Sequence, residues 1–169
     1  MALGLFAQIG LLAHLFSILV PALGAQPAGL AMGAATVCAI VGRTAVGWLM
    51  PVGADRRVVA CASTAIQAAG SGVLALSGGE SAALLLLGVM LFGSGIGNTT
   101  SLPPMIAQAE FVQTDVQRVV SLVVAWGLAI YAFAPALFGL LRSMDVTWMF
   151  GAAAAVPLLA IGCFLVGRR

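Results

Sequence analysis

The chain alternates between long apolar stretches and short polar breaks. Each apolar stretch is about 20 residues long, which is the length that an α-helix needs to cross the hydrocarbon core of a bilayer. No stretch shows the strict alternation that marks a lipid-facing β-strand. The pattern therefore predicts six membrane-spanning helices, at about residues 2–23, 28–50, 58–76, 82–106, 119–141 and 146–166.

These helices are expected to form one all-α, polytopic unit, a single six-helix transmembrane bundle over residues 1–169. The composition agrees, because 62% of the residues are hydrophobic, only 7% are charged and the mean hydropathy is +1.15. A soluble domain carries about 25% charged residues. The composition therefore excludes a soluble enzyme, a nucleic-acid binder and a disordered tail. The net charge of +2 is also too small to imply a polyanionic partner.

Arginine placement predicts the orientation of the bundle, since cytoplasmic loops carry an excess of basic residues. With six crossings, both termini share one side with the second and fourth loops. The arginines on that side are Arg56, Arg57, Arg118, Arg168 and Arg169, and the arginine on the other side is Arg142. We therefore expect an integral membrane protein, placed in the bacterial inner (plasma) membrane, with both termini cytoplasmic.

Two basic side chains lie inside the predicted spans. His14 shares a helical stripe with Gly10, Ser17 and Pro21. Its imidazole could face a cavity and bind substrate or carry a proton, or it could be a neutral group bonded to a neighbouring helix. Arg43 lies close enough to the cytoplasmic end for its head to reach the interface. Its position favours a gate or structural role over an anion site.

The fourth span is rich in glycine, carries a stripe of small polar side chains and ends in two prolines. A G-x-x-x-G pair allows two helices to approach closely, and the prolines are expected to kink or end the helix. This pattern favours a helix that lines a water-filled cavity, although tight packing alone would also produce it. The glycine pair is Gly93 and Gly97, the stripe is Ser94, Asn98 and Ser101, and the prolines are Pro103 and Pro104.

The third and fifth spans carry weaker polar features. A stripe of Ser63, Gln67, Gly70 and Ser71 in the third span is explained by helix–helix hydrogen bonding as well as by function. In the fifth span, Tyr131 and Pro135 indicate a bent helix with a phenol near mid-membrane. Tyr131 is a candidate cavity residue, and packing is the other interpretation.

The sequence predicts neither an enzyme nor a cofactor. The single histidine lies on the first span, in the wrong order for an intramembrane serine protease, and the spans hold too few carboxylates and histidines for a metal enzyme. The three cysteines match neither a zinc pattern nor a disulfide framework, so we expect them to be small apolar fillers. They are Cys38, Cys61 and Cys163.

The second loop and its flanking helices resemble the major facilitator superfamily. In that family a helix with Gly-Arg and a later Gly leads into a short cytoplasmic loop with an acidic residue and an arginine cluster. The matching positions are Gly42, Arg43, Gly47, Asp55, Arg56 and Arg57. Pro51 and Val52 stand where the family usually has its acidic residue. The glycine-rich fourth span and the segment 133–139 match further features, which are more like those of the family's C-terminal half.

The resemblance implies one half of a twelve-helix secondary transporter, and this chain corresponds to helices seven to twelve. Such a transporter moves a small solute by alternating access between two six-helix bundles. It implies that the loop residues form a cytoplasmic gate and that the first and fourth helices face the solute. The implied solute-facing residues are His14, Ser17, Ser94, Asn98 and Ser101.

Six spans make only half of such a pathway. The expected partners are the lipid bilayer, a small-molecule solute and a second bundle, which is a missing N-terminal half or a second copy in a parallel homodimer. The chain would then be a fragment, a split transporter or a self-associating half. The alternative is a non-transporting six-helix protein that acts as an assembly or regulatory subunit. The sequence does not decide whether the solute is anionic, neutral and organic, or hydrophobic and drug-like. It also does not decide between proton coupling through His14, uniport and anion exchange.

Overall fold

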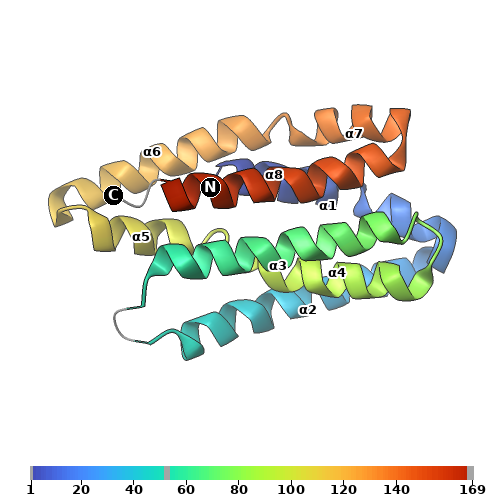
Figure 1. Ribbon diagram of the computed structural model, residues 1–169, viewed down its shortest axis with the longest axis horizontal. Helices are drawn as coiled ribbons and strands as arrows, with labels where there is room; N and C mark the ends of the chain where they lie inside the picture. Colours follow the sequence, from blue (N-terminus) through green and yellow to red (C-terminus); the bar gives the residue numbers. More distant parts are fainter. Residues whose placement is uncertain (1, 52–53, 167–169) are drawn as a thin grey trace.

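The structure, a computed structural model, describes residues 2–51 and 54–166 and is built from α-helices (Figure 1). The described residues contain no β-strand. The helices are α1 (Ala2–Leu23), α2 (Ala25–Leu49), α3 (Arg56–Leu76), α4 (Ala82–Ile96), α5 (Leu102–Glu110), α6 (Gln113–Tyr131), α7 (Ala134–Met144) and α8 (Val146–Val166).

Five helical segments in the described part of the chain are long and apolar enough to cross a membrane. They are α1, α2, α3, α8 and the segment Gln113–Met144, which joins α6 and α7. Helix α4 is apolar but has only 15 residues. The prediction of an all-α protein is therefore confirmed for the described residues, and its several long apolar helices are compatible with a polytopic membrane bundle.

Two helices begin three or more residues earlier than the hydrophobic pattern predicts. Helix α2 begins at Ala25 rather than near residue 28, and Pro27 lies in its first turn, where a missing N–H costs no hydrogen bond. Helix α6 begins at Gln113 rather than near residue 119, with Asp115 in its first turn. A carboxylate there is stabilised by the helix dipole. Polar residues therefore extend both helices beyond their apolar stretches.

Aspartate side chains cap the N-termini of α3 and α8. The Asp55 side chain accepts a hydrogen bond of 2.9 Å from the backbone N–H of Arg57 at the start of α3. At the start of α8, Asp145 accepts one of 2.7 Å from the N–H of Thr147. This backbone bond lowers the pKa of Asp145 from its ordinary value. Both contacts satisfy N–H groups that have no partner within the helix.

The fourth predicted span is broken earlier than expected. Helix α4 ends at Ile96, a non-helical turn follows, and α5 begins at Leu102. Pro103 and Pro104 therefore lie in the first turn of α5 instead of ending a longer helix. The physical reason is that proline lacks an N–H, which is not needed in a first turn but would leave carbonyl groups unpaired in a helix interior.

The fifth predicted span is bent, as expected. Helix α6 ends at Tyr131 and α7 begins at Ala134, with Pro135 in the first turn of α7. As in the fourth span, the proline lies in a first turn, where its missing N–H is not needed. Figure 1 shows α7 continuing the direction of α6 beyond this break.

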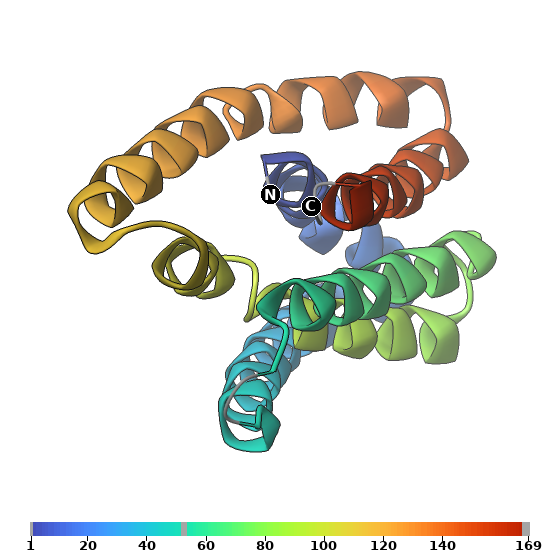
Figure 2. The same ribbon diagram turned by 60° about the vertical axis from the view of Figure 1, so that its left-hand side comes forward.

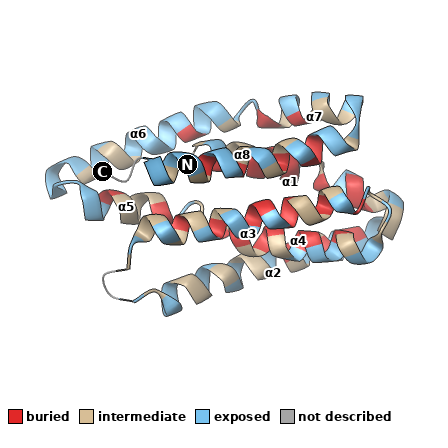
Figure 3. Cartoon of the chain, in the orientation of Figure 1, coloured by how far each residue is buried: buried red, intermediate tan, exposed pale blue. Residues whose placement is uncertain are grey.

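Helix α1 lies at the centre of the packing, because it contacts α2, α6, α7 and α8. Figure 2 shows α1 and α8 between α6–α7 on one side and α3 and α4 on the other, with α2 beyond α4. Helix α3 packs on α4 and α8, and α2 packs on α4. Buried residues concentrate in α1, α3 and α4, whereas α2 and α6 are mostly exposed or half-buried (Figure 3). The fully buried large side chains include Leu11, Leu15, Leu19, Phe92, Phe138 and Phe150.

Helices α2 and α4 approach closely through small residues. A side chain at Gly93 would meet the backbone of Ala35, and one at Gly97 would meet the carbonyl oxygen of Ala39. Gly42 lies equally close to the carbonyl oxygen of Ser94. The G-x-x-x-G pattern of the fourth span therefore forms a helix–helix contact, as its sequence predicts.

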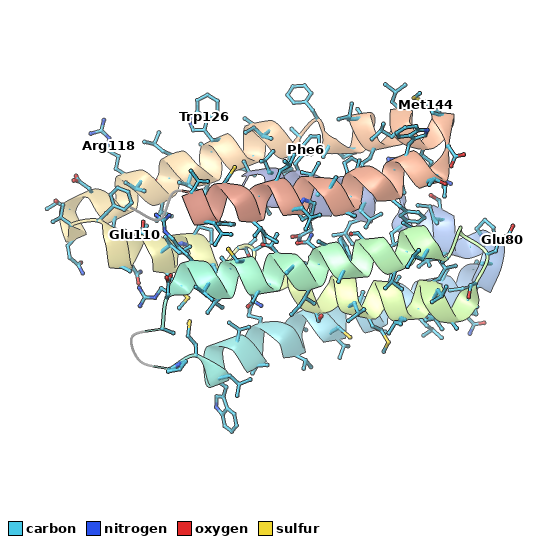
Figure 4. All side chains as sticks on the ribbon, viewed as in Figure 1. Phe6, Glu80, Glu110, Arg118, Trp126 and Met144 are labelled. Carbon is cyan, nitrogen blue, oxygen red and sulfur yellow. The ribbon has the colours of Figure 1, made fainter. Side chains whose placement is uncertain are left out.

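In Figure 1 the direction along the bundle reverses between α1, α2, α3, the α4–α5 pair, the α6–α7 pair and α8. The start of α1, the end of α2, the start of α3, the α5–α6 turn and the end of α8 lie toward the same end of the bundle. Figure 4 shows Glu110 and Arg118 near that end and Glu80 and Met144 at the other.

Candidate substrate cavity

A cavity of about 240 Å³ lies between α1, the α4–α5 break and α6. Its walls are mostly apolar, with one amide, three hydroxyl groups and no charged side chain. Several α6 residues in its wall are exposed, so the cavity opens onto the surface of the bundle there. The lining residues are Leu5, Gln8, Ile9, Thr99, Thr100, Pro103, Val123, Val124, Leu128 and Tyr131.

Gln8 lines this cavity and carries a buried, unpaired polar atom. The residue lies about two turns inside α1 and is only 6% exposed. Its Oε1 atom has no hydrogen-bond partner within the described part of the chain. An unsatisfied buried acceptor costs about 1–3 kcal/mol. In native proteins such an atom is normally paired with protein, ordered water or a bound molecule.

The break between α4 and α5 brings Thr99 and Thr100 to the cavity. Arg43 of α2 stabilises this break through two hydrogen bonds. The Nε atom of Arg43 donates to the carbonyl oxygen of Gly97 at 2.5 Å, and Nη2 donates to Oγ1 of Thr100 at 2.9 Å. In a continuous helix the Gly97 carbonyl would accept from the N–H of Ser101, which here bonds to Asn98 instead. Arg43 therefore supplies a hydrogen bond that the broken helix has lost.

This arrangement also fixes what Thr100 offers to the cavity. A hydroxyl group can donate one hydrogen bond and accept two. Because the oxygen of Thr100 accepts from Arg43, its own hydrogen is left to donate. The cavity thus combines an acceptor on Gln8 with a donor on Thr100.

The structure places His14 and Ser17 against α7, away from this cavity. His14 Nε2 lies 2.9 Å from the carbonyl oxygen of Pro135, so that nitrogen carries the hydrogen. Ser17 donates to the carbonyl oxygen of His14 at 2.8 Å and accepts from Nη1 of Arg142 at 2.5 Å. Gly10, on the same stripe, lies against the ring of Phe138. The stripe predicted on the first helix therefore faces a helix in this structure.

The polar stripe of the fourth span makes local and interhelical hydrogen bonds. Asn98 is buried, and its Nδ2 donates to Oγ of Ser63 on α3 at 3.1 Å. Ser94 donates to the carbonyl oxygen of Leu91, and Ser101 donates to that of Gly97. Among the six predicted cavity residues, only Tyr131 is in the wall of this cavity within the described ranges.

The predicted gate loop lies at the opposite end of α3 from the α3–α4 turn, and it contacts α5. Arg57 donates through Nε and Nη2 to the two carboxylate oxygens of Glu110, each at 2.5 Å. Arg56 donates to the carbonyl oxygen of Met105 at 2.7 Å. The hydrogen bond and the positive charge of Arg57 lower the pKa of Glu110 from its ordinary value. Larger hollows of about 520 and 480 Å³ lie on either side of this ion pair, at the end of the bundle.

The other predicted gate residues have local structural roles. Asp55 caps α3, Gly42 packs against α4, and a side chain at Gly47 would meet no atom within 4 Å. Val52 lies outside the described residues. The structure thus joins Arg56 and Arg57 to α5 and places Arg43 at the helix break.

Sequence reasoning missed three polar residues of the cavity, which are Gln8, Thr99 and Thr100. Gln8 is the one amide inside the first predicted span, and this was the available signal. It lies off the stripe that contains His14. The two threonines directly precede the prolines of the fourth span, but only a non-helical turn turns both of them toward α1 and α6.

Comparisons of the chain with models of known families, with curated proteins and with solved structures found no match. The resemblance to the major facilitator superfamily thus stays a prediction that rests on the sequence pattern.

Proposed function

We propose that this chain is one half of a secondary transporter of the major facilitator type, which moves a small solute by alternating access. The observation that carries the proposal is the cavity at Gln8, Thr99 and Thr100. It lies between the first helix and the broken fourth segment. The resemblance implies that the corresponding helices of each half face the solute.

The proposal requires six crossings, and we assign the fourth to α4 and α5 together. Helix α4 has 15 residues and α5 has 9, which correspond to roughly 22 and 13 Å of helix at about 1.5 Å per residue. Their combined length exceeds the hydrocarbon thickness of about 30 Å. Non-helical backbone at such a depth is tolerated where it is buried in protein or lines a cavity. The break at residues 97–101 lies at such a cavity.

The packing of the helices supports this assignment through an internal symmetry. The six crossings are α1, α2, α3, α4–α5, α6–α7 and α8, and the symmetry exchanges the first three with the last three in order. Under this exchange, the packing of α1 on α6–α7 corresponds to that of α4 on α2. Likewise, the packing of α1 on α8 corresponds to that of α4 on α3, and α3 on α8 corresponds to itself. Since the exchanged crossings run in opposite directions, the relation is an inverted repeat. Inverted repeats of three helices within each half are a feature of this transporter class.

The second bundle is part of the proposal. The cavity opens at α6, and α2 and α6 are mostly exposed or half-buried. A separate N-terminal half or a second, parallel copy of this chain would close the cavity from that side. Both termini would lie in the cytoplasm.

The alternative is a non-transporting six-helix subunit, and one observation favours it. His14 and Asn98, two of the polar groups predicted to face solute, are bonded to neighbouring helices. Such contacts stabilise a packed bundle without any solute pathway.

Cysteine labelling separates the two functions. In a chain whose native cysteines are replaced by alanine, Thr100→Cys is treated with a membrane-impermeant maleimide in right-side-out and inside-out vesicles. Asn98→Cys is the matched control, since it lies in the same break but is buried against α3. Alternating access predicts that Thr100→Cys is labelled from each side and that Asn98→Cys is protected. Protection of Thr100→Cys from both sides, or labelling from one side only, would overturn the proposal.

A further inference from the structure

We infer that the cavity between α1, the α4–α5 break and α6 binds an uncharged small solute that donates a hydrogen bond to Oε1 of Gln8. The inference rests on the proposed function and names its class of solute. It starts from Gln8, a residue that lines the cavity and whose Oε1 acceptor is buried and unpaired. A solute N–H or O–H group would satisfy this atom.

The charge distribution argues against an ionic solute. No charged side chain lines the cavity. An ion that leaves water for an apolar site without a partner loses far more hydration than a neutral polar group does. Arg43 is not in the cavity wall, and its Nε and Nη2 donors are occupied by Gly97 and Thr100. An anionic solute would therefore find no oppositely charged side chain among the residues that line the cavity.

The remaining polar groups suit a solute that both donates and accepts. Thr100 keeps a hydrogen to donate, and the phenol of Tyr131 can act in either direction. The volume of about 240 Å³ is below the roughly 300–1,000 Å³ of sites for drug-sized ligands. Small amides and alcohols therefore match the cavity in both chemistry and size.

The test measures binding to the purified full chain in lipid nanodiscs by ligand-observed saturation-transfer NMR. The neutral donors are acetamide, N-methylurea and ethylene glycol, each of which carries C–H protons that the measurement can observe. N,N-dimethylacetamide keeps the amide carbonyl but has no N–H, and acetate and methylguanidinium carry opposite charges. We expect saturable binding of at least one neutral donor and none of dimethylacetamide, acetate or methylguanidinium.

Substitutions at Gln8 then locate the contact. Gln8→Leu should weaken binding of the neutral donor about tenfold, the effect of one hydrogen bond. Gln8→Glu keeps the shape but adds a negative charge, so it should gain binding of methylguanidinium. The matched control is Gln67→Leu, because Gln67 is also a buried amide with an unpaired atom but does not line this cavity. It should leave solute binding unchanged.

Each outcome decides the inference. Equal binding of acetamide and dimethylacetamide, binding of acetate, or no saturable binding of any neutral donor would overturn it. So would equal effects of Gln8→Leu and Gln67→Leu. If Thr100→Cys is labelled from both sides while no neutral donor binds, the solute class is wrong and the transport function stands. If Thr100→Cys is protected, the transport function itself fails.

Discussion

The close contact between α2 and α4 provides a sharp test of the packing. A Cβ atom at Gly93 would lie 2.6 Å from the carbonyl oxygen and 2.9 Å from the Cα atom of Ala35. Ordinary contact begins near 3.4 Å, so Gly93→Ala requires the two helices to separate locally by roughly 0.8 Å. Both obstructing atoms belong to the backbone, and no side-chain rotation can relieve the clash.

The expected cost is that of overpacking, about 1–3 kcal/mol in the free energy of unfolding. Replacing a helical glycine also gains up to about 1 kcal/mol of helix propensity, which would hide part of this cost. Gly33→Ala is the matched control, because Gly33 lies inside α2 and a Cβ atom there would meet nothing within 4 Å. The difference between the two variants cancels the propensity gain.

The measurement is the loss of helical circular dichroism as sodium dodecyl sulfate is added to the full chain in mild detergent micelles. Gly93→Ala should unfold at a lower dodecyl sulfate fraction than Gly33→Ala, by an amount equal to about 1–3 kcal/mol. If the two variants agree within about 0.5 kcal/mol, the close backbone contact between α2 and α4 is refuted.

Three further predictions concern polar contacts. Arg43→Leu removes the side-chain donors at the helix break and should destabilise the chain by about 1–3 kcal/mol in the same unfolding assay, with Arg43→Lys recovering only part; full stability of the leucine variant would contradict the role of Arg43. The pKa of Glu110 is lowered by Arg57, so its ion pair stabilises the fold above the ordinary glutamate pKa of about 4.3 and this contribution is lost as the pH falls below it. The unfolding free energies of wild type and Glu110→Gln should differ by at most about 1 kcal/mol near neutral pH and converge in acid; a gap that widens in acid would have the wrong sign. His14→Leu should cost about 1 kcal/mol of stability yet leave solute binding unchanged, whereas a loss of binding at full stability would place His14 at the solute.

The hydrophobic pattern predicted the helical class and most helix positions, because apolar runs of this length have few alternatives to a helix in lipid. It also predicted the bend in the fifth span from Pro135 and the close contact from Gly93 and Gly97. It placed the break of the fourth span at Pro103, whereas the helix already ends at Ile96. Sequence shows that a proline is disfavoured in a helix interior, although Pro21 and Pro157 do lie inside α1 and α8. Where the fourth span breaks depends on the neighbouring helix, here on the hydrogen bonds from Arg43.

The candidate site was predicted less well than the fold. A polar stripe at His14 shows which face of a helix is polar, but the same stripe serves a cavity or a neighbouring helix. The structure turns His14 toward α7, while Gln8, off that stripe, is left with an unpaired acceptor in a cavity wall.

The sequence by itself determined that this is an all-α chain with several helices that can cross a membrane, since length and hydropathy are properties of each segment alone. Only the tertiary structure decided which polar side chains are satisfied by other helices and which face open space. Hydrogen bonding in a bundle is a relation between segments far apart in the chain, as between Arg43 and Thr100, and no local pattern contains the partner. The pairing of Asn98 with Ser63 and the cavity at Gln8 arise at that level.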